Sequence, residues 1–348
     1  MRRHPIIQMV VIGAIASAIG IVLALWINWF PADAAKQDQP IDTLYDVLMI
    51  VSIPIFVLVM TVILYSVWAF RMRPGQENED GPPVHGNTRL EVFWTAIPAI
   101  LLVSLCSYAY AVLNDIETKH DNELVVKVQA VQFAWTFSYP QADGRAVVSS
   151  QLYLPKDQPV RFDIQSEDVL HDFWVPAFRV KIDAVPGMTT RLRVTPTKLG
   201  SYPVVCAELC GLGHSVMRST AHVLTPAAFN RWLASKQAPA PAAGGGGGEA
   251  RQLSQAQLVA LGRATFTGDG GCGACHTLAD AGTSGTTGPD LDRVLTGQSE
   301  DELRTDIVDP NARIASGYAA NIMPPNFGQT LSGQQLDGLV AYLATVSK

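Results

Sequence analysis

Charged residues are scarce in this sequence, and positive charge is not in excess. Asp, Glu, Lys and Arg make up 16% of the 348 residues, and the net charge is −6. Because nucleic-acid-binding proteins present a basic surface, this balance argues against a nucleic-acid partner. Hydrophobic residues reach 48% and are concentrated in the first third of the chain. These proportions favour a membrane anchor that carries soluble domains.

Cysteine is also rare. Four of the five cysteines form two close pairs, Cys206 with Cys210 and Cys272 with Cys275. The pairs have different spacings, C-x3-C and C-x2-C, and a histidine follows each pair. This pattern favours two cofactor sites over a disulfide framework.

Three apolar runs are long enough to cross a bilayer, which takes roughly 20 residues. They cover about residues 6–30, 44–70 and 92–113. Arginines precede the first run and lie between the second and third runs, whereas the other flanking segments are poor in Lys and Arg. The positive-inside rule therefore places the 71–90 loop inside and everything after about residue 114 outside.

The first apolar run has two interpretations. A basic start, an apolar stretch and the sequence "ADAA" resemble a signal peptide that is cleaved after Ala34. The run is about 25 residues long, beyond the roughly 7–15 residues of a usual signal core, which favours a retained transmembrane helix. Both interpretations give the rest of the chain the same orientation across the membrane.

The chain divides further by pattern. We expect an N-terminal apolar segment at 1–43 and a transmembrane helix hairpin at 44–118. "ELVVKVQAVQFAWTFSYP" alternates and is rich in Val and aromatics, which predicts an all-β domain, a sandwich, at 119–234. "KQAPAPAAGGGGGEA" predicts a linker at 235–250. Helical spacing in "SQAQLVALGRATF" and "SGQQLDGLVAYLATV" predicts a small all-α domain at 251–348.

The stretch "VVCAELCGLGHSVM" gathers soft metal ligands. Thiolate, imidazole and thioether groups together select copper over calcium or magnesium, and zinc has little use for methionine. Two cysteines in one loop can bridge two metal ions and so share one electron between them. The loop needs a further histidine, which "DVLHDFWVP" offers. The candidate ligands are Cys206, Cys210, His214, Met217 and His171. A structural disulfide or a zinc site between the two cysteines is the alternative.

This loop resembles the binuclear copper (CuA) motif, C-x-E-x-C-x3-H-x2-M, of cytochrome c oxidase subunit II. "DVLHDFWVP" and "KIDAVPG" resemble the upstream segment that supplies the family's first histidine, and the resemblance covers about residues 44–232. It implies a cupredoxin-like Greek-key sandwich that follows two transmembrane helices. It also implies that Cys206 and Cys210 bridge both coppers, and that His171 and His214 each complete one copper.

The same resemblance implies roles for four further groups. Met217 would be a weak ligand to one copper, and the backbone carbonyl of Glu208 a ligand to the other. The Glu208 carboxylate would also reach a magnesium ion at the border with the catalytic subunit. "LEVFWTAIP" resembles the start of the family's second helix, where Glu91 would stand at the inner mouth of a proton path. A helix-end charge favoured by the helix dipole is the alternative for Glu91.

"VQFAWTFSY" resembles the family's aromatic stretch beneath the copper. The first aromatic there is usually a tryptophan that takes electrons from an external cytochrome. Phe133 stands at that position here, and Trp135 is the second aromatic. The alternative is that Trp135 and Phe137 are core aromatics of the sandwich.

"CGACH" is the C-x-x-C-H attachment motif of c-type haem. Cys272 and Cys275 would bond to the haem vinyl groups, and His276 would bind the iron axially. Met323, in "NIMPPNF", is the only methionine after Met217 and is the candidate sixth ligand. These residues make 251–348 resemble a class I cytochrome c domain. A thioredoxin-like or zinc site, and a packing role for Met323, are the alternatives.

The whole chain therefore resembles subunit II of a respiratory haem–copper oxygen reductase with a fused cytochrome c. The resemblance implies a multi-pass protein of the bacterial plasma membrane with its copper and haem domains on the outer face. Electrons would pass from an external donor, cytochrome c or a neighbouring respiratory complex, through haem c and CuA to catalytic subunit I. That subunit would reduce oxygen to water with proton translocation, in a complex with other subunits.

Other functions share parts of this pattern. A quinol oxidase subunit II lacks the copper ligands, and all of them are present here. A nitric oxide reductase subunit with the same copper domain would share the sequence features. A membrane-tethered electron carrier is a non-enzymatic alternative, although a simple tether needs no "LEVFWTAIP" motif.

Overall fold

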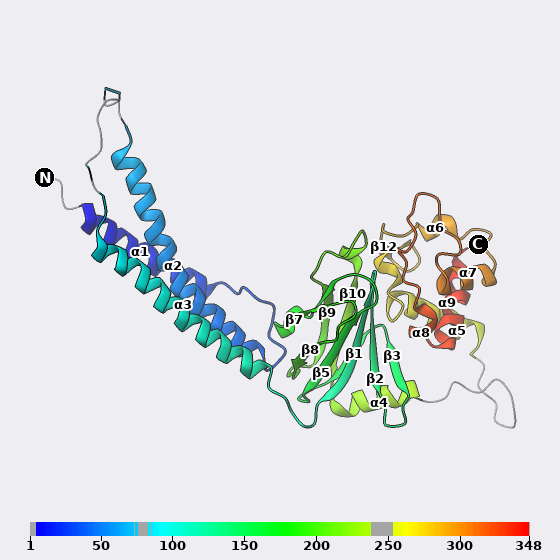
Figure 1. The fold of residues 1–348 in the computed structure, drawn as a ribbon. Coiled ribbons are helices and arrows are strands. Elements are labelled where there is room, and N and C mark those ends of the chain that lie inside the picture. Colours follow the sequence, from blue (N-terminus) through cyan, green and yellow to red (C-terminus); the bar gives the residue numbers. More distant parts are fainter. Residues whose placement is uncertain (1–4, 73, 76–82, 84, 238–252, 348) are drawn as a thin grey trace. The chain divides into compact units, whose positions relative to one another are not determined.

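The computed structural model describes residues 5–72, 74–75, 83, 85–237 and 253–347 (Figure 1). Most of the predicted linker at 235–250 lies outside the described residues. The chain forms two compact units, one of Met1–Pro31 with Asp38–Thr118, and one of Ala32–Gln37 with Lys119–Lys348.

The first unit consists of long apolar helices, α1 (Pro5–Trp26), α2 (Asp38–Phe70) and α3 (Thr88–Ile116). Each is long and apolar enough to cross a membrane. Helix α2 packs against both of the others. Gly20 lets α1 approach α2 closely, because a Cβ at this position would lie 2.8 Å from a methyl group of Ile53.

The segment Ala32–Gln37 belongs to the second unit, where it pairs with the β-domain. The N–H of Ala34 donates to the carbonyl of Ala177 at 3.1 Å, and the Ala34 carbonyl accepts from the N–H of Thr197 at 2.7 Å. Ala34 is fully buried. The "ADAA" sequence is therefore part of the packed β-domain in this structure.

The predicted β-sandwich is confirmed: the described residues between 119 and 237 form two five-stranded sheets (Figure 1). One sheet has the order β3-β2-β1-β5-β8 and the other the order β4-β10-β9-β6-β7. The strands are β1 (Leu124–Val131), β2 (Ala134–Pro140), β3 (Ala146–Ser149), β4 (Leu152–Pro155), β5 (Val160–Ser166), β6 (His171–Trp174), β7 (Lys181–Ala184), β8 (Thr190–Val194), β9 (Gly200–Cys206) and β10 (Arg218–Leu224). Parallel pairing of β1 with β5 and of β4 with β10 requires the chain to cross between strands that are not neighbours in sequence.

Alternating side chains build the core between the sheets. Strand β1 buries Val126 and Val128, and β2 buries Trp135 and Phe137, with polar residues on the opposite faces. Each such aromatic or aliphatic side chain contributes roughly 1.5–3 kcal/mol when fully buried. The buried positions change from even to odd numbers between Ala130 and Phe133, and this change of phase marks the turn that joins the two strands.

The second sheet brings the two metal-ligand segments together. Strand β6 begins at His171 and pairs with β9, which ends at Cys206. Phe173 of β6 is the register partner of Cys206. The loop between β9 and β10 carries the remaining candidate ligands. Helix α4 (Pro226–Gln237), which the sequence pattern does not predict, packs against β3, β4 and β10. Its Trp232 stacks on Tyr153 with ring centroids 4.2 Å apart.

The C-terminal part is helical, as predicted. Its helices are α5 (Gln255–Thr267), α6 (Leu291–Val294), α7 (Glu300–Val308), α8 (Phe327–Thr330) and α9 (Gly333–Val346), and a short hairpin joins β11 (Thr277–Leu278) to β12 (Thr283–Ser284). Helices α5 and α9 cross where Gly262 meets Gly338, and a Cβ at Gly262 would overlap the Gly338 carbonyl. Capping boxes at Ser254, Ser299 and Ser332 begin α5, α7 and α9.

Candidate metal centre and haem site

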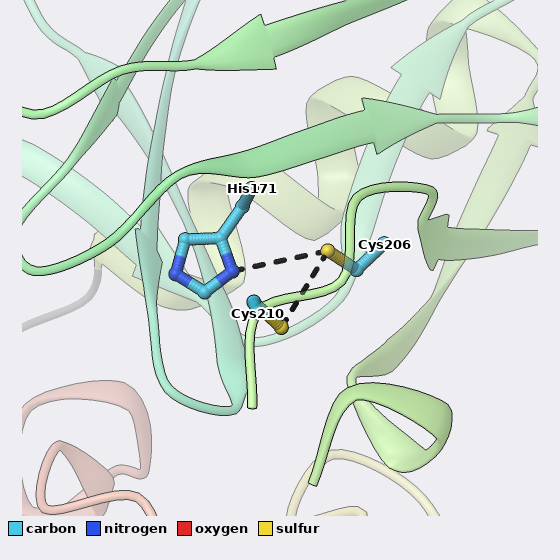
Figure 2. A group of neighbouring side chains, drawn as sticks. All are labelled: His171, Cys206 and Cys210. Atoms are coloured by element: carbon cyan, nitrogen blue, oxygen red, sulfur yellow. Dashed lines mark hydrogen bonds between the residues drawn. The ribbon is translucent and has the colours of Figure 1, made fainter. Parts of the chain in front are cut away.

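The structure brings the predicted copper ligands into one buried cluster. The ligand atoms of His171, Cys206 and Cys210 all lie within 4.8 Å of one another. Figure 2 shows the His171 ring from β6 directed at the Cys206 sulfur, with the Cys210 sulfur beside it. Cys206 Sγ lies 3.8 Å from His171 Nδ1 and 3.8 Å from Cys210 Sγ.

The other predicted ligands contact these sulfurs. Cys206 Sγ is 3.2 Å from the carbonyl oxygen of Glu208. Cys210 Sγ is 3.6 Å from His214 Nδ1 and 3.9 Å from the sulfur of Met217. Met217 is fully buried and His214 is half-buried.

These spacings fit a soft metal ion. A tetrahedral ion with bonds of about 2.3 Å to two thiolates holds the sulfurs about 3.8 Å apart. The sulfur–sulfur distance in the cluster is 3.8 Å, well beyond a disulfide bond, and all five cysteines are free. The structural disulfide considered from the sequence therefore does not occur in this structure.

The charges in the cluster also favour a cation. Burial opposes ionisation of Cys206, but the His171 ring and nearby backbone groups lower the pKa of its thiol to about 7. Burial and the neighbouring Cys206 raise the pKa of Cys210. A metal ion would take the place of the thiol protons in this group, since metal binding requires deprotonated ligands.

Two groups that the sequence motifs do not reveal, Asp168 and Gln132, lie beside the ligands. Asp168 Oδ1 lies 2.9 Å from His171 Nε2, and burial of this carboxylate is outweighed by hydrogen bonds from Gln132 and His171, which lower the pKa of Asp168. The side-chain amide of Gln132 donates to the carbonyl of Cys210. In the sequence, the only indication of this contact is that Asp168 lies three residues before His171.

The aromatic residues of this stretch contact different parts of the ligand set. Phe133 is buried against the ligand loop, where a Cβ at Gly211 would lie 3.1 Å from its ring. Trp135 is a core residue whose ring stands edge-on to His171, with centroids 6.2 Å apart. Phe137 is fully buried in the sandwich. Trp135 is therefore a core aromatic of the sandwich that also contacts a candidate ligand.

The haem-attachment residues lie on a tight turn after α5. The N–H groups of Cys275 and His276 both donate to the carbonyl of Cys272, at 3.2 and 3.0 Å. His276 is buried, which lowers the pKa of its imidazole and keeps it neutral. Its Nδ1 is 2.9 Å from the Pro289 carbonyl, so Nε2 remains for a metal.

A large cavity fits a haem at this turn. It has a volume of about 860 Å³, and Cys272, Cys275, His276 and Met323 all line it. Glycines make room for the ligand turn, since a Cβ at Gly288 would lie 2.5 Å from the His276 ring. Apolar side chains of the helical core, including Leu303, Ile307 and Leu339, complete the walls. The residues present therefore suit a flat apolar group with two thiol attachments and two axial ligands.

Glu91 lies in the helical unit rather than with either cluster. It is exposed in the first turn of α3, and its carboxylate accepts from the N–H of Asn87 at 3.1 Å. Asn87 in turn caps the helix by accepting from the N–H of Leu90. This contact agrees with the helix-end role weighed for Glu91.

Comparisons with known proteins cover most of the chain. Three family models match: cytochrome C oxidase subunit II, transmembrane domain, at residues 9–112; its periplasmic domain at 107–223; and cytochrome c at 259–347. Cytochrome c oxidase subunit 2 of Thermostichus vulcanus is 32% identical over 65% of this chain and 85% of its own length. Cytochrome c oxidase subunit 2 of Alkalihalophilus pseudofirmus is 30% identical over 86% of each chain.

A solved structure also resembles part of the chain. The periplasmic domain of subunit II of cytochrome oxidase from Bradyrhizobium japonicum is 28% identical, with a TM-score of 0.32, over 34% of this chain and 96% of that one. The family and the fused domain imply a copper centre, a haem, and association with a catalytic subunit in a membrane complex. The chain belongs to the cytochrome c oxidase subunit II family and carries a C-terminal cytochrome c domain.

Proposed function

We propose that this oxidase subunit holds a binuclear CuA-type centre in residues 119–234 and a covalent haem c in residues 251–348. The proposed copper ligands are Cys206 and Cys210 as bridges, His171 and His214 as terminal ligands, and Met217 and the Glu208 carbonyl as weaker ligands. The proposed haem ligands are the thiols of Cys272 and Cys275, with His276 and Met323 on the iron.

One observation carries the binuclear assignment. Each central sulfur has its own pair of partners, one histidine and one weak donor. His171 and the Glu208 carbonyl accompany Cys206, whereas His214 and Met217 accompany Cys210. Six donors exceed the four that a single tetrahedral ion takes. Two metal ions that share both sulfurs would use every donor.

When bound, the two groups supply one-electron chemistry, in which haem c receives an electron from an external donor and the copper centre relays it to the catalytic subunit. Contacts within the second compact unit support transfer between them. Asn326, in the loop of Met323, donates to the hydroxyl of Thr136 on β2 at 2.8 Å. Phe133 and Trp135 line the same cavity as the haem-attachment residues.

The tethered haem domain would allow phenylalanine at position 133, where the family usually has a tryptophan that takes electrons from an external cytochrome. Because the docking partner is part of the same chain, its effective concentration is on the order of millimolar. Phe133→Trp should therefore change the haem-to-copper electron-transfer rate less than about threefold, measured by flash photolysis. A gain of tenfold or more would show that the tether does not compensate for the missing tryptophan.

The electron donor should present a basic or apolar face. Residues 249–348 contain 11 acidic and 6 basic side chains, so the haem domain is acidic. Complementary charge mainly raises the association rate, and that rate falls with ionic strength. Reduction of the haem by a basic cytochrome should slow as salt is added.

The partner side of the copper loop offers an acidic group beside apolar surface. Glu208 is exposed, and the adjacent Leu209 is 78% exposed. This favours contact with the catalytic subunit and a magnesium ion held through the Glu208 carboxylate. The assembled complex would lie in the bacterial plasma membrane with both cofactor domains on the outer face. In this orientation Glu91 would stand on the inner side, at the entrance of a proton path.

Purification with native metals tests this assignment. The detergent-solubilised complex should contain a haem-rich catalytic subunit, two coppers for each chain in addition to that subunit's own copper, and one haem c. Its oxygen uptake should exceed its nitric oxide uptake. Recovery of the chain alone with both its cofactors would favour a tethered carrier, and faster nitric oxide uptake would favour a nitric oxide reductase.

A further inference from the structure

We propose that Gln132 and Asp168 form a hydrogen-bonded link that sets the distance between the two halves of the copper ligand set. Both are positioning residues, since neither offers a ligand atom to the cluster. The inference rests on the proposed copper site, and it assigns a function to the turn between β1 and β2.

Asp168 acts on the β6 half through His171. Its Oδ1 lies 2.9 Å from His171 Nε2, while Nδ1 of the same ring faces Cys206. A carboxylate on Nε2 retains the proton there and leaves the Nδ1 lone pair for metal, which also fixes the ring plane. The N–H of Val169 donates to the same carboxylate oxygen at 2.7 Å and holds it in place.

Gln132 connects this carboxylate to the loop half. Its backbone N–H donates to Asp168 Oδ2 at 2.7 Å. Its side-chain amide donates to the carbonyl of Cys210 at 2.5 Å. One residue therefore joins the histidine segment to the cysteine loop, although Asp168 and Cys210 are 36 and 78 positions away from it in sequence.

The ligand loop packs directly on this turn. A Cβ at Gly211 would lie 2.8 Å from the Gln132 amide, and one at Gly213 would overlap the Phe133 ring. Gly211 also has a φ of +132°, which other residues rarely adopt. The glycines of "CGLGH" therefore let the loop lie against Gln132 and Phe133, so the turn supports the loop over its length.

A fixed separation matters for a centre that gains and loses single electrons. His171 and Cys210 come from different parts of the fold, and relative motion would change the metal–ligand distances with each electron. Hydrogen bonds to ligand residues typically alter metal affinity by 10–100-fold when removed. The Gln132–Asp168 link would hold both halves at one spacing in both redox states.

A double-mutant cycle in the full-length haem-containing protein tests the link. Asp168→Asn keeps the side-chain shape, and Gln132→Met keeps the length but removes the amide donor. After chelation, copper is titrated back, and affinity and the paramagnetic resonance spectrum are recorded. Each variant should bind copper about 10–100-fold more weakly with altered hyperfine splitting. The double variant should lose less than the product of the two single losses.

Matched variants in the same domain serve as controls. Asp163→Asn and Gln165→Met change the same residue types on β5, where Asp163 pairs with Arg161 and Gln165 contacts Thr189. Both should bind copper like the unmodified protein. If Gln132→Met unfolds at a lower temperature, Gln132→Glu tests the same contact with the loop. It should lose a similar amount of copper affinity.

The possible results separate the two proposals. Unchanged affinity and spectra in the Asp168 and Gln132 variants would overturn the positioning role, and fully multiplicative losses would overturn the link between the residues. Failure of the unmodified protein to bind copper would instead overturn the proposed copper site itself.

Discussion

The copper and haem sites use similar ligand residues but are built in opposite ways. At the copper site, the donors already lie 3.2–3.9 Å from the central sulfurs. A rigid pair of strands and a hydrogen-bonded loop hold them. At the haem site, the ligand residues line a cavity of about 860 Å³, whose walls include core residues of the helical domain and also the β-domain residues Phe133 and Trp135. The proposed copper centre would therefore occupy a preformed set of ligands, whereas the proposed haem would complete the core of its domain.

This difference predicts which cofactor each domain needs in order to fold. A rigid empty cavity costs about 24 cal/mol per Å³. Several core side chains of the helical domain line the cavity at the haem site, so they would lose packing contacts without a haem. The candidate copper ligands, by contrast, already lie within 3.9 Å of one of the two central sulfurs.

The largest expected effect is therefore loss of the haem domain's fold. The double variant Cys272→Ser, Cys275→Ser should carry no covalent haem, and residues 253–347 should lose cooperative unfolding. Haem staining and hydrogen exchange measure the two outcomes. Gln329→Ala, at an exposed site, is the control. A haem-free domain that remained protected from exchange would show that the cavity can close without haem.

Removal of copper should affect function but leave the β-domain folded. The double variant Cys206→Ser, Cys210→Ser should bind no copper at this site, and its metal-free β-domain should unfold within about 4–8 °C of the metal-free parent, equivalent to about 1 kcal/mol. Calorimetry and metal analysis provide the test. Cys106→Ser, on the exposed face of α3, should retain copper. Complete unfolding without copper would contradict the preformed site.

The two methionines provide a finer comparison. Met323→His should lower the haem reduction potential, because His/Met ligation raises it. Met217→Leu should retain both coppers, since this weak ligand is fully buried and the substitution preserves volume. Optical redox titration measures the haem potential of Met323→His, and metal analysis measures the copper content of Met217→Leu. The exposed Met188→Leu is the control. An unchanged haem potential in Met323→His would exclude Met323 as an axial ligand.

The smallest effect should come from a helix cap of the haem domain. Ser332 accepts from the N–H of Gln335 at 3.2 Å and begins α9. Ser332→Ala should cost about 1 kcal/mol of that domain's stability, with copper binding unchanged. Thermal unfolding of the haem-loaded protein measures this, with the exposed Ser284→Ala as reference. A loss several times larger would indicate that α9 depends on its cap more than on its packing.

The sequence shows the proposed ligands more clearly than the residues that position them. Cys206, Cys210, His214 and Met217 share one loop, so their spacing is visible in the chain. His171 could be found because the loop still needed a histidine. Membrane helices and the sandwich were predictable because burial repeats along them at a fixed period.

The supporting contacts have no such signature. The bonds of Gln132 to Asp168 and Cys210 join residues far apart in the chain, and each involves a common polar side chain. The turn at Gln132 contains neither glycine nor proline, so only a change in the phase of the alternation between Ala130 and Phe133 marks it. Helix α4 is stabilised by aromatic packing on the sandwich, such as Trp232 on Tyr153, which depends on the tertiary fold.

Electron paramagnetic resonance of the oxidised, copper-loaded protein tests the central proposal most directly. If Cys206 and Cys210 bridge two coppers, the hyperfine pattern should show one unpaired electron shared equally by two copper nuclei, and metal analysis of the same sample should give two coppers in this chain. A spectrum of an electron confined to one nucleus, or a sample with a single copper in this chain, would contradict the account.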